Sequence, residues 1–259
     1  MLSKNKIKHI ASLHQKKQRE LQGEFFAEGT KLVMELLNSH FEVTGIYATG
    51  EWFENNILPS DFTGEKSIIS MHEMERITAL STPSPCLLTL KTRNVIFNAS
   101  IAKSALVLVL DDIKDPGNLG TIIRAADWFG FRHIVCSEQT VDLFNPKTIQ
   151  STMGSIARVN ICYRNLETMF KELDGAVKVY GALLDGTNML DKELSDSGII
   201  VIGNESRGIS ESIRPYISDK IFIPSFQPDD LSGGAESLNA SIANAIICYE
   251  FRRNRMISK

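Results

Sequence analysis

The stretch ALVLVLDDIKDPGNLGTIIRAADWFG, residues 105–130, decides the fold. Its first six residues are apolar without interruption, which is typical of a parallel strand covered on both faces. Its second half has the spacing of an amphipathic helix, with Asn118 as a suitable N-cap and Gly130 as a C-cap. Ligands of open parallel sheets bind beyond the carboxyl ends of the strands. The polar joint between these two elements is therefore a candidate binding site.

The second half of the chain repeats this alternation. The expected strands lie at 132–138, 159–163, 177–183, 197–205 and 220–226, and the expected helices at 145–157, 165–175, 210–217 and 237–255. Strands that alternate with helices predict an α/β fold with a parallel sheet. Residues 1–97 have the pattern of a smaller α/β unit that opens with a basic amphipathic helix at 5–21. We therefore expect two domains, 1–97 and 98–259.

The composition bounds the class of protein. The chain has 259 residues, of which 43% are hydrophobic, enough for a sizeable core. No apolar run approaches the roughly 20 residues that span a bilayer, and the N-terminus lacks the apolar stretch of a secretory signal. The four cysteines are far apart and no pair has metal-ligand spacing, while the five histidines are scattered. This pattern favours buried thiols, no metal site, no membrane partner and a cytoplasmic location.

Basic residues gather at both ends of the chain, although the net charge is only -3. Residues 1–31 contain seven Lys or Arg against three Glu, and the tail FRRNRMISK adds four basic residues. We expect Lys16, Lys17 and Arg19 to meet phosphate groups. A basic helix face that is merely solvated is the alternative.

Two further strand ends carry unusual polar residues. The stretch GIIVIGNESRGIS, residues 198–210, ends in a glycine-flanked Asn–Glu pair, and FIPSFQPDDLSGGAESLNASIA, residues 222–243, leads into the last helix. The glycines there would let backbone approach a ligand closely. Each residue alone has an ordinary explanation, since Asn118 and Ser237 suit helix caps and Glu205 suits a helix start. Neither a P-loop nor a G-x-G-x-x-G is present, which removes the main support for nucleotide hydrolysis and dinucleotide binding.

Taken together and in this order, the three stretches resemble the SpoU (TrmH-type) branch of the SPOUT methyltransferases. The family's motifs N-x-G-x-x-x-R, G-N-E-x-x-G-[IL] and I-P…S-L-N match residues 118–124, 203–209 and 223–239. The resemblance covers residues 106–251. The N-terminal GEFFAEGTKLVMELL, residues 23–37, resembles a substrate-binding module of the ribosomal-protein type.

The resemblance implies transfer of a methyl group from S-adenosylmethionine to a ribose 2′-hydroxyl of RNA. Ribosomal RNA is favoured over transfer RNA, because the N-terminal module accompanies several ribosomal-RNA members. The implied fold is a knotted parallel sheet, a trefoil α/β knot, preceded by a small α/β RNA-binding domain. The family is typically dimeric, and the last helix would supply part of that interface through Leu238, Ile242, Ala245, Ile246 and Tyr249. An RNA-binding protein without turnover and a small-molecule α/β enzyme are the alternatives.

The resemblance also implies roles for single residues. Arg124 would act on the ribose hydroxyl, either as a base or as a fixed positive donor that also clamps a phosphate. The residues that would orient ribose, Arg124 and cofactor are Asn118, Glu205, Ser237 and Asn239. The residues that would contact the cofactor are Gly203, Asn204, Glu205, Gly208, Ile223 and Leu238. One departure is the lengthened loop at 225–236, in which Gly234 is the nearest match to the family's loop glycine.

Overall fold

The structure is a computed structural model that describes residues 1–173, 175–226 and 237–257. Its contacts divide the chain into two compact units. The first unit consists of residues 1–94 and 142–157, and the second of residues 95–141 and the chain from residue 158 onward. The expected division into an RNA-binding domain, 1–97, and a methyltransferase domain, 98–259, stays a prediction.

The first unit has a four-stranded sheet in the order β1-β4-β2-β3, in which only β2 and β3 run parallel. Its strands are β1 (Glu24–Glu28), β2 (Val43–Ala48), β3 (Glu65–Ile68) and β4 (Cys86–Lys91). Its helices are α1 (Lys4–Ser12), α2 (Lys16–Gln22), α3 (Thr30–Leu37), α4 (Gly50–Asn55), α5 (Met71–Glu75) and α7 (Pro146–Thr152), with the 3-10 turn η2 (Ser155–Ala157). The small α/β unit expected here is present.

The expected single helix at 5–21 is wrong, because the chain breaks between α1 and α2. Leu13 is fully buried together with Ile7 and Ile10 of α1, so the chain turns there to follow the core. The carbonyls of Leu13 and His14 accept hydrogen bonds from Nη1 of Arg19, at 2.7 and 2.9 Å. Carbonyls at a helix end lack intrahelical partners, and here an arginine side chain supplies them.

The segment 142–157 packs into the first unit. The ring of Phe144 lies 4.7 Å from that of Phe25 on β1, measured between centroids. Gly154 has φ +94°, and a Cβ on it would lie 2.8 Å from Cβ of Glu35. A side chain at this position would be strained by the backbone and would crowd α3 as well.

The second unit has a six-stranded sheet in which every pair is parallel, in the order β10-β8-β9-β5-β6-β7. Its strands are β5 (Leu106–Leu110), β6 (His133–Ser137), β7 (Asn160–Arg164), β8 (Val179–Asn188), β9 (Gly198–Ile202) and β10 (Asp219–Phe222). All residues of β5 and β9 are buried, as the uninterrupted apolar runs predict. The two strands are neighbours, so the loops that follow them emerge side by side at the carboxyl edge.

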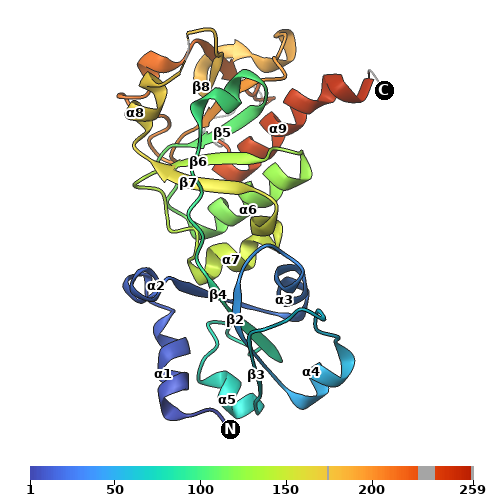
Figure 1. Ribbon diagram of the computed structural model, residues 1–259. Helices are drawn as coiled ribbons and strands as arrows, with labels where there is room; N and C mark the ends of the chain where they lie inside the picture. Colours follow the sequence, from blue (N-terminus) through green and yellow to red (C-terminus); the bar gives the residue numbers. More distant parts are fainter. Residues whose placement is uncertain (174, 227–236, 258–259) are drawn as a thin grey trace. The chain divides into compact units, whose positions relative to one another are not determined.

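Helices cover both faces of this sheet. They are α6 (Pro116–Trp128), α8 (Leu166–Lys171) and α9 (Ala240–Ile257), with the 3-10 turns η1 (Ala99–Lys103), η3 (Met189–Asp191) and η4 (Arg214–Tyr216). α6 and α9 pack side by side (Figure 1), while η1 and α8 share a core with Val107 and Val109 of β5. The α/β fold with a parallel sheet is thus confirmed, whereas the knotted threading stays a prediction.

The helix expected at 210–217 is wrong, because only the short turn η4 forms there. Pro215 removes a backbone donor, and Nε of Arg214 donates to the carbonyl of Ile209 at 3.2 Å. Ser210 is also held elsewhere, by Asp111 of the neighbouring loop.

The four cysteines are free and buried, as expected from their apolar surroundings. Burial raises the pKa of Cys162 to about 11 and that of Cys248 to about 12, so both thiols remain protonated at neutral pH. Within the described residues, no helix has the length and apolar character that a membrane span requires.

Candidate active site

Asp115, not Asn118, caps α6. The side chain of Asp115 accepts a hydrogen bond from the backbone N–H of Asn118 at 2.8 Å, and Pro116 occupies the first helical position. The expectation that Asn118 is the N-cap is therefore wrong. Its side chain is instead free to face the neighbouring loops.

Asn118 lies at the centre of a hydrogen-bonded chain that joins all three motifs. Its Nδ2 donates to Oε1 of Glu205 at 2.8 Å, and its Oδ1 accepts from Nδ2 of Asn239 at 3.0 Å. Oδ1 of Asn239 in turn accepts from the backbone N–H and the hydroxyl of Ser241, at 2.9 and 2.7 Å. The backbone N–H of Ser241 can only donate, so the atom of Asn239 that faces it must be the amide oxygen. Nδ2 of Asn239 then faces Oδ1 of Asn118, which fixes the orientation of the Asn118 amide as well. Glu205 is consequently the acceptor at the end of the chain.

Glu205 sits in a tight loop after β9. Asn204 and Gly208 exchange two backbone hydrogen bonds, at 3.0 and 2.9 Å, which close the loop around Glu205. A Cβ on Gly203 would lie only 2.3 Å from backbone atoms of Gly208 and Ile209, and Gly208 itself has φ +68°. Both glycines are therefore required by the loop's own fold.

The third motif reaches the site through Asn239, which precedes the first residue of α9. Ser237 is exposed and does not cap the helix, since Asn239 does. Leu238 is 47% exposed, so it is not a core residue, and Ile223 is half-buried at the end of β10. The predictions about Gly234, and those for residues 227–236 in general, lie outside the described residues.

Arg124 lies apart from the Asn118–Glu205–Asn239 chain. Asn118 and Arg124 are six residues apart on α6, which corresponds to about 240° around the helix axis and about 9 Å along it. The Arg124 side chain is exposed and has no ion-pair partner among the described residues. Within the described part of the chain, this guanidinium is thus not committed to an ion pair.

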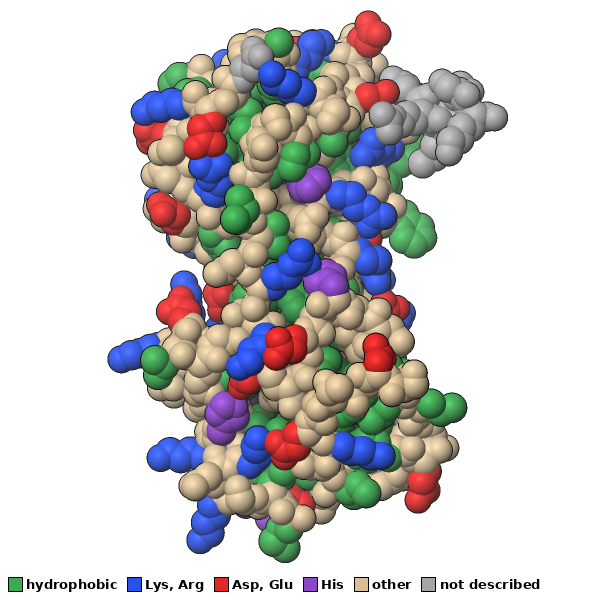
Figure 2. Space-filling model, viewed as in Figure 1, with side chains coloured by type: hydrophobic (Ala, Val, Ile, Leu, Met, Phe, Trp, Pro, Cys, Tyr) green, Lys and Arg blue, Asp and Glu red, His purple; other side chains and the backbone are tan. Residues whose placement is uncertain are grey.

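The three basic residues expected to meet phosphate differ in their surroundings. Lys16 and Lys17 are exposed on α2, and Lys16 forms only a long ion pair with Glu20, at 3.7 Å. Arg19 is 3% exposed, and its Nη2 lies 2.6 Å from Oδ2 of Asp142. The prediction that Arg19 binds RNA is therefore corrected, because its guanidinium is buried and donates four hydrogen bonds within the first unit. In Figure 2, Lys and Arg side chains project over the region of α1 and α2, and elsewhere on this face they alternate with Asp and Glu.

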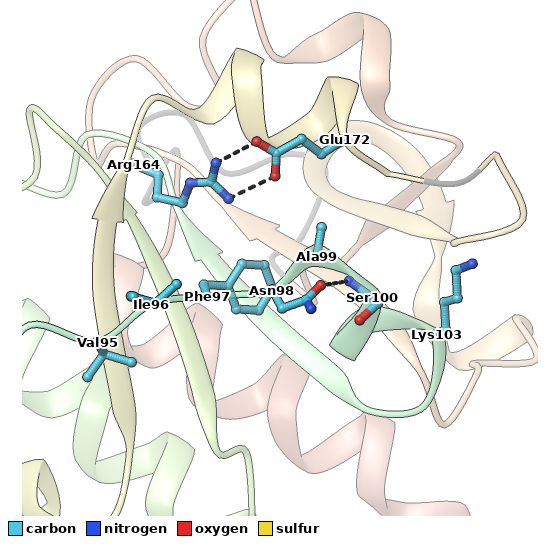
Figure 3. A pocket seen from close by; sticks show the side chains of 9 residues that line it. All are labelled: Val95, Ile96, Phe97, Asn98, Ala99, Ser100, Lys103, Arg164 and Glu172. Carbon is cyan, nitrogen blue, oxygen red and sulfur yellow. Dashed lines mark hydrogen bonds and ion pairs between the residues drawn. The ribbon is translucent and has the colours of Figure 1, made fainter.

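A cavity of about 700 Å³ opens elsewhere in the second unit and contains none of the motif residues. Its wall includes Phe97, Asn98 and a two-pronged ion pair between Arg164 and Glu172, with distances of 2.9 and 2.6 Å (Figure 3). Among the described residues, no group of three or more His, Cys, Asp or Glu is placed to hold a metal ion.

Two residues that contact the candidate site, Asp111 and Asp112, are not identified by the sequence analysis. Asp111 and Asp112 follow β5 and hold the loop of Glu205 by side-chain and backbone contacts. The signal for Asp112 is its position after a buried strand, but its left-handed backbone, φ +63°, cannot be read from residue type.

A parallel sheet with three polar strand-end loops converging at one carboxyl edge is the architecture of an α/β enzyme. Comparison with known proteins identifies the class. The model of the SpoU rRNA methylase family matches residues 105–249, and that of the MRM3-like substrate-binding domain matches residues 4–87. The chain belongs to the SpoU rRNA methylase family.

Individual relatives resemble the chain over nearly its whole length. The 23S rRNA (guanosine(2553)-2′-O)-methyltransferase RlmP of Bacillus subtilis is 34% identical over 251 residues, covering 95% of this chain and 96% of that protein. A TrmH-family structure from Porphyromonas gingivalis has a TM-score of 0.84 and 35% identity, covering 98% of this chain and 99% of that one. An AdoMet-bound rRNA methyltransferase from Sinorhizobium meliloti has a TM-score of 0.83 and 27% identity, and the match covers 98% of this chain and 96% of that one.

Proposed function

We propose that this protein is an S-adenosylmethionine-dependent methyltransferase that methylates a ribose 2′-hydroxyl of ribosomal RNA in the cytoplasm. The observation that carries the proposal is the chain Asn239–Asn118–Glu205, because it joins the three family motifs in one hydrogen-bonded unit. The relative from Bacillus subtilis, which is named for 2′-O methylation of 23S rRNA, supports the choice of RNA.

The residues present fit the cofactor. Ile223 offers a half-buried apolar side chain to an adenine ring, Leu238 would contribute backbone groups, and Glu205 offers a carboxylate in the loop after β9. A carboxylate suits the positive sulfonium centre. When bound, S-adenosylmethionine supplies an activated methyl group whose leaving group is neutral, so the reaction calls for no metal.

The task left to the protein concerns the ribose hydroxyl, which is a very weak acid. We assign to Arg124 the stabilisation of negative charge that develops on this oxygen, together with a contact to a neighbouring phosphate. A guanidinium is a fixed donor fork and is protonated under ordinary conditions, so it suits this role better than that of a base. Asn118, Asn239 and Ser237 would orient the ribose and Glu205.

We also propose that two copies of the chain pair through α9. Three apolar side chains form an exposed stripe at helical spacing on this helix, and Ala245 lies half-buried among them. The stripe consists of Ile242 (53% exposed), Ile246 (38%) and Tyr249 (45%), and Leu238 (47%) precedes the helix. Exposed apolar stripes of this kind are typical of protein interfaces, and a second copy would cover this one.

The first unit would supply RNA affinity and the choice of site. The match of residues 4–87 to a substrate-binding domain supports this division of labour, and Lys16 and Lys17 are the exposed cations we assign to it. Phosphate contacts position a protein on RNA, while recognition of the target rests on shape and unpaired bases.

The test is incubation of the full chain with methyl-labelled S-adenosylmethionine and total RNA from a strain that lacks the protein, followed by separation of ribosomal and transfer RNA. We expect label in a 2′-O-methylated nucleoside of the ribosomal RNA after complete digestion. Label in transfer RNA alone would transfer the proposal to that substrate. RNA binding without label would favour a binding protein that retains the fold.

A further inference from the structure

Asp112 adopts a left-handed backbone conformation that is uncommon for residues other than glycine. It follows β5 with φ +63°, in the left-handed region where residues other than Gly, Asn and Asp are rare. Such conformations persist when surrounding contacts hold them, and they cluster at functional sites. The contacts of Asp112 show what this conformation achieves.

Asp112 holds the Glu205 loop through both its backbone and its side chain. Its carbonyl oxygen accepts a hydrogen bond from Nδ2 of Asn204 at 2.7 Å. Its Oδ2 accepts from Nη2 of Arg207 at 2.6 Å. Glu205 lies between these two anchored residues in the sequence.

Asp112 is itself anchored from the other side. Its N–H donates to Oγ of Ser137 at 2.9 Å, and its Oδ1 forms an ion pair with Nζ of Lys114 at 2.5 Å. The preceding residue, Asp111, fixes the far end of the loop, where its Oδ2 accepts from both N–H and Oγ of Ser210 at 2.7 Å. The loop is thus tied at three points to the end of β5.

The inside of the loop depends on these ties. Oδ1 of Asn204 accepts from the backbone N–H groups of Ser206 and Arg207, at 3.0 and 3.1 Å. If Asn204 and Arg207 lose their partner, the turn that aims Glu205 at Asn118 loses its external support. A displacement of about 1 Å at a catalytic group is enough to slow a reaction strongly.

We propose that Asp112 is a positioning residue that sets the place of Glu205, and through it of Asn118, for the reaction. The inference rests on the proposed function but concerns a residue outside the three family motifs. The left-handed backbone presents the carbonyl to Asn204, and the carboxylate holds Arg207. Substitutions that keep the backbone conformation therefore isolate the contribution of the carboxylate.

The test compares Asp112→Gly and Asp112→Asn in the full chain. Glycine tolerates φ +63° and keeps the carbonyl for Asn204 but removes the carboxylate, whereas asparagine tolerates the same φ and keeps one acceptor for Arg207. The matched control is Glu172→Gln, which weakens a carboxylate–arginine pair of the same kind in the same unit, far from the motifs in the sequence (Figure 3).

The first readout is the single-turnover rate of methyl transfer at saturating RNA and S-adenosylmethionine. The rate is divided by the number of cofactor sites, which is counted separately by titration with S-adenosylhomocysteine. We expect Asp112→Gly to lose about tenfold or more, Asp112→Asn to recover part of the loss, and Glu172→Gln to equal the wild type. We expect the melting temperature of Asp112→Gly to stay near that of the wild type, since the glycine relieves backbone strain. A wild-type rate for Asp112→Gly would overturn the proposal.

The second readout does not depend on activity. Hydrogen exchange of the backbone amides of Asn204 and Gly208 should accelerate in Asp112→Gly and stay unchanged in Glu172→Gln, because these amides close the loop. Unchanged exchange in Asp112→Gly would overturn the proposal even in an active enzyme. Faster exchange in Asp112→Gly, found together with a wild type that transfers no methyl group to RNA, would support the positioning role and refute the proposed function.

Discussion

Arg19 and Asp142 form a buried ion pair, with 2.6 Å between Nη2 and Oδ2, although 123 positions separate them in the chain. Their side chains are 4% and 18% exposed. The pair joins α2 to the segment 142–157, which lies beyond the first strands of the second unit in the sequence. The first unit is therefore completed by residues that the chain supplies only after leaving it.

We expect Arg19→Ala to lower the free energy of unfolding by about 3 kcal/mol, because it leaves the largely buried Asp142 carboxylate without its cation. It also removes the donor for the carbonyls of Leu13 and His14. Urea unfolding measures the loss. Lys17→Ala, an exposed neighbour on the same helix, should change stability by no more than about 0.5 kcal/mol. Equal stabilities for the two variants would contradict the structural role of Arg19.

This ion pair shows where reading the sequence fails. Spacing along the chain correctly predicts the strands of both sheets, because an apolar run is a local signal. It does not reveal that 142–157 packs beside β1, since the contacts of Phe144 with Phe25 depend on the tertiary fold. It likewise assigns Arg19 to RNA, because a buried arginine and an exposed one look alike in a basic helix.

The candidate site shows the same limit at closer range. The motifs identify Asn118, Glu205 and Asn239, and the structure joins them. Sequence reasoning makes Asn118 the helix cap, because asparagine and aspartate suit that position almost equally and only the backbone selects Asp115. The anchoring by Asp112 depends on its positive φ, which residue type does not encode.

Charge reversal of Lys16 and Lys17 to Glu should weaken RNA binding and flatten its salt dependence. Each phosphate contact that is lost lowers the slope of log K against log salt by about 0.7–0.9. Titrations of RNA at several salt concentrations measure this, and S-adenosylhomocysteine affinity serves as the control. An unchanged slope would show that this helix face is only solvated.

Glu28 predicts a pH dependence of stability. Burial raises the pKa of its carboxyl group, and hydrogen bonds from the Thr78 hydroxyl and the Ala79 N–H offset only part of this effect. The folded state therefore prefers the protonated form. The stabilisation from Glu28 is fully present below its ordinary pKa and is lost as the pH rises through the raised value.

Glu28→Gln should accordingly gain stability relative to the wild type at neutral pH, and this gain should shrink toward pH 4. Thermal unfolding across this pH range measures the difference. Glu54→Gln, at an exposed position on α4, should show no such trend. A gain for Glu28→Gln that grows as the pH falls would have the wrong sign for a raised pKa.

The exposed stripe on α9 predicts the oligomeric state. Ile242→Asp and Ile246→Asp should convert a dimer into a monomer, because a charge at the centre of an apolar interface is left desolvated without a partner. Sedimentation measures the mass of each variant. Ile57→Asp, which alters an 89% exposed isoleucine of the first unit, should remain dimeric. A monomeric wild type would exclude this interface.

The central claim is that Arg124 acts on a ribose hydroxyl that receives its methyl group beside Glu205. The measurement is single-turnover methyl transfer to saturating ribosomal RNA by wild type, Arg124→Ala and Arg124→Lys, with S-adenosylhomocysteine affinity measured in parallel. Losing one preorganised stabiliser of developing charge costs about 10²–10³ in rate. Lysine should recover little of it if the planar fork holds phosphate and ribose oxygen together. We predict this loss for Arg124→Ala with nearly unchanged S-adenosylhomocysteine affinity, and a near-normal rate for that variant would contradict the account.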